Sequence, residues 1–191
     1  MTQPDISAQH SAATADRQKL RQYFLKLRQS LNSVEKRQAD QILQQKLLDW
    51  HNLHKPACLG VYWPIKGEPD LLPAFRQLQQ QAQQLALPRV VQAGAPLEFC
   101  LWQDDSELQT DRYGIPTPAD QAAVVKPDVL LIPCVGFNRD NFRLGYGGGF
   151  YDRTLAQAPR PYTLGIAYAC LAGEFAATEF DIPLDRILTE V

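Results

Sequence analysis

The sequence predicts an α/β protein, a single three-layer α/β/α sandwich with a mainly parallel sheet. Segments with helical periodicity alternate with short apolar runs, as in βαβ architectures. Several runs, such as Val129–Ile132, are apolar at every position, which is typical of strands buried on both faces. The 191 residues contain no internal repeat and no linker that would divide one core. We therefore expect a single domain over residues 15–191.

The first predicted element is an amphipathic helix that begins at Asp16. Residues 1–14 are mostly Gln, Ser, Ala and Thr with little to bury, so we expect them to form a disordered tail. After Asp16, apolar residues recur on one helical face: Leu20, Phe24, Leu27 and Leu31. Ser33 is the candidate N-cap of a second helix that extends to about Trp50.

The remaining elements follow from apolar runs and turn signals. A third helix is expected from Pro73 to Gln84, and turn residues are frequent between residues 104 and 126. A fourth helix opens near Gly149. The expected strands cover residues 57–62, 85–87, 97–102, 129–132, 162–167 and 186–189.

Charge and composition narrow the function classes. A net charge of −2 and a pI near 5.9 give no overall basic field, so we expect no nucleic-acid partner. No apolar run approaches the length of a membrane span, and the polar N-terminus lacks the apolar core of a signal peptide. We therefore expect a cytoplasmic protein, without a membrane partner, that meets any anionic ligand with local arginines.

The most informative segment is Arg143–Arg153, with the sequence RLGYGGGFYDR. It follows the apolar run 129–132 and carries four glycines within positions 145–149. Backbone N–H groups in such a loop converge on anions, which predicts phosphate binding. The alternative is a flexible turn without a ligand. Ordering three consecutive glycines costs roughly 0.5–1 kcal/mol each relative to Ala. A turn needs only one or two glycines, so the excess favours close approach of the backbone to phosphate.

The loop matches neither of the two common phosphate-binding motifs. A Walker A loop requires a lysine after its glycines, and none follows here. A dinucleotide motif would begin at Gly145 and Gly147 but has Phe150 at the position of its last glycine. Classical P-loop kinases and hydride-transfer enzymes are therefore disfavoured.

Charged residues near the loop and on the first helix have two interpretations each. Arg143 is either a surface charge or a bidentate phosphate ligand. Asp152 is either a helix cap or, with a nucleotide present, a hard oxygen ligand for Mg²⁺. On the first helix Arg17, Arg21 and Arg28 share one stripe, which taken alone indicates a solvated helix face.

Aromatic residues follow the first predicted strand. Tyr62 and Trp63 precede Pro64 and the carboxylate of Glu68. Such aromatics are more often core residues, although the pair would also suit a flat heteroaromatic ring. The three histidines have no Ser or Cys partner that would suggest a catalytic triad.

The segment Arg143–Arg153 closely resembles the signature of the 5-formyltetrahydrofolate cyclo-ligase family, also called methenyltetrahydrofolate synthetases. The resemblance extends from about residue 16 through most of the chain, at 62–70, 86–89, 96–99 and 113–116. It implies a ligase of one-carbon metabolism with a fold similar to sugar-phosphate isomerases and CoA transferases. The implied reaction is ATP- and Mg²⁺-dependent conversion of 5-formyltetrahydrofolate, with or without a polyglutamate tail, to 5,10-methenyltetrahydrofolate, releasing ADP and phosphate.

The resemblance also implies roles for individual residues. Arg143 would be catalytic, and Mg²⁺ would bind Asp152 and Asp185. Folate would contact Glu68 and Tyr151, with Trp63 and Trp102 as weaker candidates. ATP would contact Arg17, Arg21, Arg143, Gly145, Tyr146, Gly147, Gly148, Gly149, Phe150, Tyr151 and Asp152.

Three positions depart from the family pattern: Arg17 where lysine is usual, Asn138 where aspartate is usual, and Asn141 where glycine is common. Asn138 is therefore not expected to bind metal, and Asn141 still tolerates a positive φ. A non-catalytic folate- or nucleotide-binding module on the same scaffold is the alternative function, and a sugar-phosphate isomerase is a weaker one. We expect a monomer or a weak dimer.

Overall fold

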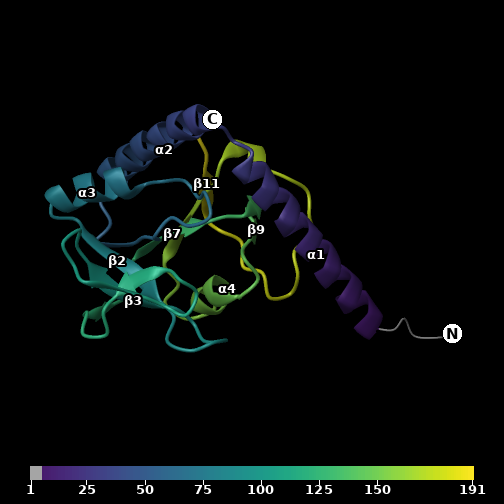
Figure 1. The fold of residues 1–191 in the computed structure, drawn as a ribbon. Coiled ribbons are helices and arrows are strands. Elements are labelled where there is room, and N and C mark those ends of the chain that lie inside the picture. Colours follow the sequence, from purple (N-terminus) through teal and green to yellow (C-terminus); the bar gives the residue numbers. More distant parts are fainter. Residues whose placement is uncertain (1–5) are drawn as a thin grey trace.

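The computed structural model describes residues 6–191, with side chains from residue 16 onward (Figure 1). Its centre is a seven-stranded sheet in the order β11-β10-β7-β1-β2-β3-β6. The five strands from β11 to β2 are parallel, and β3 pairs antiparallel with both β2 and β6, so the mainly parallel sheet is confirmed. The strands are β1 Cys58–Gly60, β2 Gln84–Arg89, β3 Glu98–Trp102, β6 Val124–Val125, β7 Val129–Pro133, β10 Tyr162–Ile166 and β11 Arg186–Leu188.

Helices lie on both faces of this sheet, which gives the three predicted layers (Figure 1). The helices are α1 Ile6–Gln29, α2 Ser33–His54, α3 Leu72–Gln80 and α4 Phe150–Leu155, with a 3-10 turn at Ala169–Leu171. Alternate residues of β7 face opposite layers. Leu131 packs in the core under α2 and α3, whereas Leu130 and Ile132 pack with Leu155 of α4. The helical layer that contains α4 is thin because α4 has only six residues.

The helix boundaries differ from the sequence prediction at three places. Helix α1 begins at Ile6 rather than Asp16, which differs from the predicted tail over residues 6–14. Ala and Gln there are good helix formers that extend an existing helix without an apolar face. Asn32, not Ser33, caps α2, because its side chain accepts from Val34 N and Glu35 N in a capping box. Residues 1–5 of the predicted tail lie outside the described residues.

The third helix ends at Gln80 rather than Gln84. Ala82 adopts a φ of 61°, which ends the helical path, and Gln84 already begins β2. The glutamine run is therefore divided between a helix end, a turn and a strand.

Two short hairpins also depart from the prediction. Strands β4 Leu108–Thr110 and β5 Pro116–Pro118 pair within the predicted turn region. Strands β8 Gly136–Phe137 and β9 Arg143–Leu144 separate β7 from the glycine loop. Strands of two or three residues are too short to show a period of two in the sequence.

The turn between β8 and β9 explains two of the family departures. Buried Asn138 accepts hydrogen bonds from the N–H groups of Asp140 and Phe142, and its Nδ2 donates to the carbonyl of Phe175. That donation requires an amide, which an ionised aspartate lacks. Asn141 has a φ of 61°, as expected for a residue at a glycine position.

Candidate active site

The glycine loop, residues 145–149, lies in the wall of a cavity of about 1070 Å³. Pro133 at the end of β7, Pro88 near the end of β2, and Tyr62 just after β1 also line it. The cavity therefore lies beyond the carboxyl ends of parallel strands, where open α/β sheets bind ligands. Its volume is at the upper end of the roughly 300–1,000 Å³ that single small-molecule sites occupy, and so leaves room for two substrates.

The glycine loop presents free backbone donors to this cavity. The N–H groups of residues 146–149 donate no hydrogen bond to any part of the chain that the structure describes. Gly147 and Gly149 have φ values of 97° and 65°, which side chains rarely adopt. Gly145 has no positive φ, and a Cβ atom added to it would meet no other atom within 4 Å. Packing within the protein therefore gives no reason for glycine at 145, whereas close approach of a ligand does.

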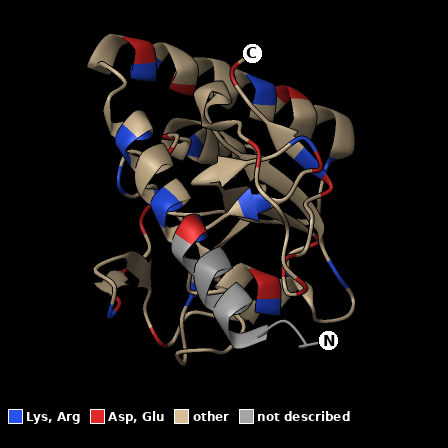
Figure 2. Ribbon diagram, turned by 90° about the vertical axis from the view of Figure 1, so that its right-hand side faces the viewer, with Lys and Arg blue, Asp and Glu red and all other residues tan. Residues whose placement is uncertain are grey.

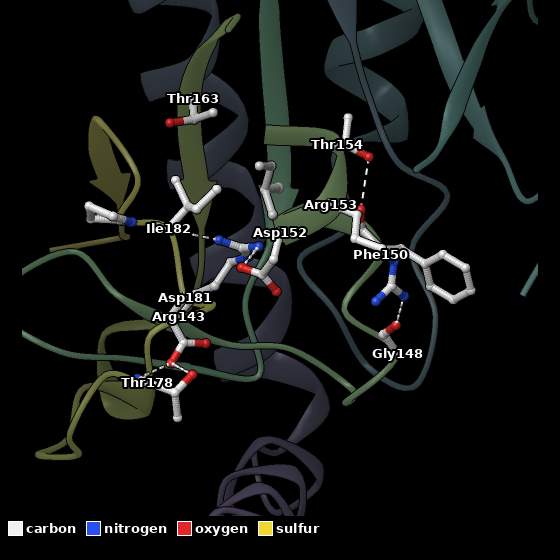
Figure 3. Close-up of polar contacts among 12 residues, drawn as sticks. Arg143, Gly148, Phe150, Asp152, Arg153, Thr154, Thr163, Thr178, Asp181 and Ile182 are labelled. Atoms are coloured by element: carbon white, nitrogen blue, oxygen red, sulfur yellow. Dashed lines mark hydrogen bonds and ion pairs between the residues drawn. The ribbon is translucent and has the colours of Figure 1, made fainter. Parts of the chain in front are cut away.

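Arg143 and Asp152 form an ion pair in the wall of the cavity. Arg143 is 6% exposed, and its Nη2 donates to Asp152 Oδ1 at 2.7 Å. Its Nη1 donates to the carbonyl of Ile182 at 3.0 Å, so the guanidinium is fixed from two sides (Figure 3). The Arg143 Cζ also lies 5.9 Å from the centre of the Tyr151 ring. The structure thus brings three sequence-predicted residues together in a rigid arrangement.

Basic residues recur along α1 (Figure 2). Two of them, Arg17 and Arg21, line the same cavity. Arg21 donates from Nε to the carbonyl of Gly145 at 2.9 Å. Burial, together with the positive charge of Arg17, lowers the pKa of the Arg21 guanidinium, which indicates a site suited to an added anion. Arg17 lines the cavity but is bound bidentately by Asp181, at 2.8 and 3.0 Å.

The third arginine of the stripe does not lie on a solvated face. Arg28 is 2% exposed and donates from Nη2 to the hydroxyl of Tyr146 at 2.6 Å. Tyr146 in turn donates to Oε1 of Glu68 at 2.8 Å. The interpretation of the stripe as a solvated face is therefore wrong for Arg28, because Tyr146 and Glu68 cover this part of the stripe.

Aromatic and apolar residues form much of the remaining cavity wall. Trp63 and Tyr151 line the cavity, as does Glu68, which is only 3% exposed. Burial raises the pKa of Glu68, while hydrogen bonds from Ile65 N and Tyr146 oppose that rise. Trp102 does not line the cavity. It is buried and packs edge-on against Trp63, with 6.2 Å between ring centres, so it supports the wall from behind.

Asp185 does not lie in the cavity wall. Its Oδ2 accepts from the backbone N and hydroxyl of Thr163, at 2.8 and 2.6 Å, and from Arg160 at 3.4 Å. Asp185 thus ties the start of β11 to the start of β10. Asp181, four residues earlier, lines the cavity instead.

Several wall residues carry no local signal that would identify them from the sequence. The segment 178–181 closes one side and includes the exposed aromatic Phe180. The apolar side is completed by residues from three separate segments: Val90, Leu97, Tyr113 and Ile115. In the sequence, only the family resemblance at 96–99 and 113–116 and the turn signal at Tyr113–Pro116 mark any of these residues.

The carboxylates of this wall fit a magnesium ion that accompanies nucleotide phosphates. Mg²⁺ takes hard oxygen ligands, keeps several waters and needs only one or two protein carboxylates beside phosphate oxygens. Asp152 and Asp181 both line the cavity, as does the glycine loop. Within residues 16–191 no group of three or more His, Cys, Asp or Glu residues could hold a metal by itself. The donor set therefore suits a metal that arrives with its nucleotide.

The fold and the site together define an α/β enzyme class in which free amides, arginines and aromatic side chains line one large cavity. Comparison with known proteins identifies the family. The model of the 5-formyltetrahydrofolate cyclo-ligase family matches residues 13–190. The chain belongs to this family of ligases.

Individual relatives agree with this assignment. The chain is 33% identical to a 5-formyltetrahydrofolate cyclo-ligase of Mycoplasma pneumoniae, over 92% of this chain and 99% of the relative. It is 31% identical to that of Haemophilus influenzae, over 92% and 98%.

In this structure no helix among the described residues is long and apolar enough to cross a membrane.

Solved structures resemble the chain along nearly its whole length. The 5,10-methenyltetrahydrofolate synthetase of M. pneumoniae superposes with a TM-score of 0.78 at 29% identity, covering 92% of this chain and 99% of that one. The synthetase of Aquifex aeolicus gives a TM-score of 0.80 at 28% identity, covering 91% and 89%. The predicted family and fold class are both confirmed.

Proposed function

We propose that this protein catalyses the ATP- and Mg²⁺-dependent cyclisation of 5-formyltetrahydrofolate to 5,10-methenyltetrahydrofolate, with release of ADP and phosphate. The single observation that carries the proposal is the glycine loop. Its free N–H groups at residues 146–149 face a cavity that also contains a buried carboxylate and an aromatic wall. This arrangement suits a phosphoryl donor on one side and a flat heterocycle on the other.

The reaction requires activation of an amide oxygen. The formyl group on N5 is an amide, and its oxygen is a poor leaving group. That oxygen attacks the γ-phosphorus, the bond from this phosphorus to the bridging oxygen breaks, and ADP leaves with the electron pair. The N5 lone pair forms the C=N bond of an iminium phosphate. N10 then attacks the formyl carbon and loses its proton. Phosphate departs with the C–O electron pair, leaving the methenyl bridge.

The chain's residues position the reactants and neutralise charge in this scheme. The amides of the glycine loop and Arg143 hold the phosphoryl oxygens, and Arg21 and Arg17 add positive charge from α1. No nucleophilic side chain takes part, since preorganised donors are enough to stabilise phosphoryl transfer. This is consistent with the lack of a catalytic triad in the sequence.

Mg²⁺ would be held by Asp152 and Asp181, which both line the cavity. When bound, it neutralises charge on the phosphate oxygens. We propose Asp181 in place of Asp185 because Asp185 is outside the cavity and already bound by Thr163 and Arg160.

The folate would lie against the apolar wall, in contact with Trp63 and Tyr151. Glu68 offers carboxylate oxygens to ring N–H donors at this wall. Trp102 supports Trp63 without touching the substrate, since it lies behind the wall.

The decisive experiment mixes purified protein with 5-formyltetrahydrofolate and Mg-ATP and follows the absorbance of the methenyl product. We expect product formation that requires ATP and stops when EDTA removes Mg²⁺. Binding of both substrates by calorimetry without product would support the alternative of a non-catalytic module. Absence of both binding and product would exclude either function.

A further inference from the structure

The Arg28 side chain is buried in a position that fold stability alone does not explain. It is 2% exposed, and its Nε and Nη1 have no partner among the residues that the structure describes. A buried charge with unpaired donors costs free energy, and apolar residues of similar volume are often as stable or more stable at such sites. The position therefore calls for a reason other than packing.

Among the described residues, the one side-chain hydrogen bond of Arg28 leads toward the cavity. Its Nη2 donates to the hydroxyl of Tyr146 at 2.6 Å, and this hydroxyl donates to Glu68 at 2.8 Å. The other oxygen of Glu68 accepts from Ile65 N at 2.9 Å. The hydroxyl thus lies between a buried cation and a buried anion, and both oxygens of the carboxylate have a fixed donor. Such charge-assisted chains hold their members in one geometry.

The hydrogen bonds from Arg28 through Tyr146 to Glu68 join three segments that are distant in sequence. Arg28 belongs to α1, Tyr146 to the glycine loop and Glu68 to the turn after β1. Lys66, in the same turn as Glu68, lies with its Nζ 5.1 Å from the centre of the Tyr146 ring. Arg28 Cζ lies 5.8 Å from the same centre. Two cations therefore keep Tyr146 at the boundary between the glycine loop and the Glu68 turn.

We propose that Arg28 is a positioning residue for the reaction: acting through the Tyr146 hydroxyl, it keeps the Glu68 carboxylate ionised and oriented toward the folate. The inference rests on the proposed function, because it assigns Glu68 to the folate side of the cavity. Arg28 itself does not line the cavity and makes no contact with substrate.

The charge balance around Glu68 gives the proposal a measurable consequence. Burial raises the pKa of Glu68, whereas the positive charges of Arg28 and Lys66 lower it. Removing Arg28 therefore raises the pKa further, and the carboxylate becomes protonated at a higher pH. The other titratable groups that interact with Glu68, each of them neutral below its own raised pKa, are Tyr62, Cys134, Tyr146 and Tyr151.

The experiment compares Arg28→Met, Arg28→Lys, Tyr146→Phe and the double variant R28M/Y146F with the unmodified protein. We expect R28M and Y146F each to move the acid limb of kcat/KM for 5-formyltetrahydrofolate to higher pH by about one unit, at the low end of the effect of a neighbouring charge. On the acid limb, at pH values below the pKa of Glu68, the KM for folate should rise about tenfold, which corresponds to the same one-unit shift. The KM for Mg-ATP should change by less than about threefold, a small difference in binding free energy.

Two further comparisons separate positioning from a purely structural role. The double variant should show no larger shift of the acid limb and no higher KM than either single variant, since each substitution breaks the same chain of hydrogen bonds. R28K keeps the positive charge, so its acid limb of kcat/KM should lie close to that of the unmodified protein. Lys26→Met removes an exposed charge from the same helix and serves as the matched control with an unchanged profile.

Each outcome has a distinct meaning. Unmoved acid limbs in active R28M and Y146F, or additive losses in the double variant, would overturn the role of Arg28 while leaving the proposed function intact. If R28M fails to fold, Y146F and R28K still decide the question. An unmodified protein that makes no methenyl product would instead remove the proposed function itself.

Discussion

Two arginine–aspartate pairs of this protein illustrate how the same chemistry serves different ends. Arg143 and Asp152 are joined at 2.7 Å in the wall of the cavity. Arg160 and Asp185 are joined at 3.4 Å at the starts of β10 and β11. The first pair lies near the carboxyl ends of the parallel strands and the second at their amino ends. Strand direction, rather than residue type, therefore separates the candidate reaction centre from a structural contact.

The largest expected difference between the pairs is in turnover. Arg143→Ala should lower kcat by roughly 10²–10³-fold, because it removes a preorganised donor from the phosphate wall. Arg160→Ala is the matched control and should retain turnover within about twofold, as an exposed ion pair contributes little. The rate of methenyl product formation, together with circular dichroism to verify folding, measures both. Near-normal turnover in a folded R143A protein would remove this arginine from the mechanism.

The aspartates should differ next in metal dependence. Asp152→Ala should raise the Mg²⁺ concentration needed for half-maximal rate by about tenfold or more, as loss of a carboxylate ligand weakens a hard-cation site. Asp185→Ala should leave that concentration unchanged. A magnesium titration at saturating ATP and folate tests this. The assignment of Asp152 fails if the two titration curves coincide.

Stability should show the opposite order for the aspartates. Asp185→Ala leaves the backbone N and hydroxyl of buried Thr163 without their acceptor, which should cost about 1–3 kcal/mol of unfolding free energy. Replacing Asp152, which is partly exposed and bonded to one arginine, should lower the unfolding free energy by a smaller amount. Urea unfolding of the two alanine variants gives the comparison. Equal losses would contradict the structural role of Asp185.

The smallest expected effect concerns pH and Glu68. Because burial raises its folded-state pKa above that of the unfolded chain, its stabilising contribution is full below the unfolded pKa and is lost as pH rises through the folded pKa. Glu68→Gln removes this titration. The unfolding free energy of E68Q should therefore fall less than that of the unmodified protein as pH rises from about 4.5, the ordinary value of a glutamate. Parallel curves from urea unfolding between pH 4 and 8 would show that the burial has no such cost.

The local parts of the site could be predicted from the sequence. Gly145–Gly149, Arg143 and Asp152 lie within eleven consecutive residues, so their chemistry appears as one motif. The parallel sheet followed from runs such as Val129–Ile132. The site's position at the carboxyl end of the sheet then followed from topology.

The remaining parts depend on packing between distant segments. Asp181 and Asp185 lie four residues apart, and only the path of the chain into β11 determines which one faces the cavity. Arg28 resembled a solvated residue because the α1 stripe does not reveal that Tyr146 and Glu68 cover it. The apolar wall comes from segments whose residues have no common motif.

The Arg17–Asp181 ion pair has a consequence for how ligands enter. Asp181 currently satisfies the guanidinium that a phosphate would otherwise engage, and the same carboxylate accepts from the N–H and hydroxyl of Thr178. A nucleotide that binds Arg17 must therefore exchange with an internal anion, and the exchange frees Asp181 at the same moment. The measured ATP affinity would then include the free energy of exchanging one partner of Arg17 for another. Asp181→Asn removes the internal anion, so this variant should bind nucleotide more tightly when Mg²⁺ is left out.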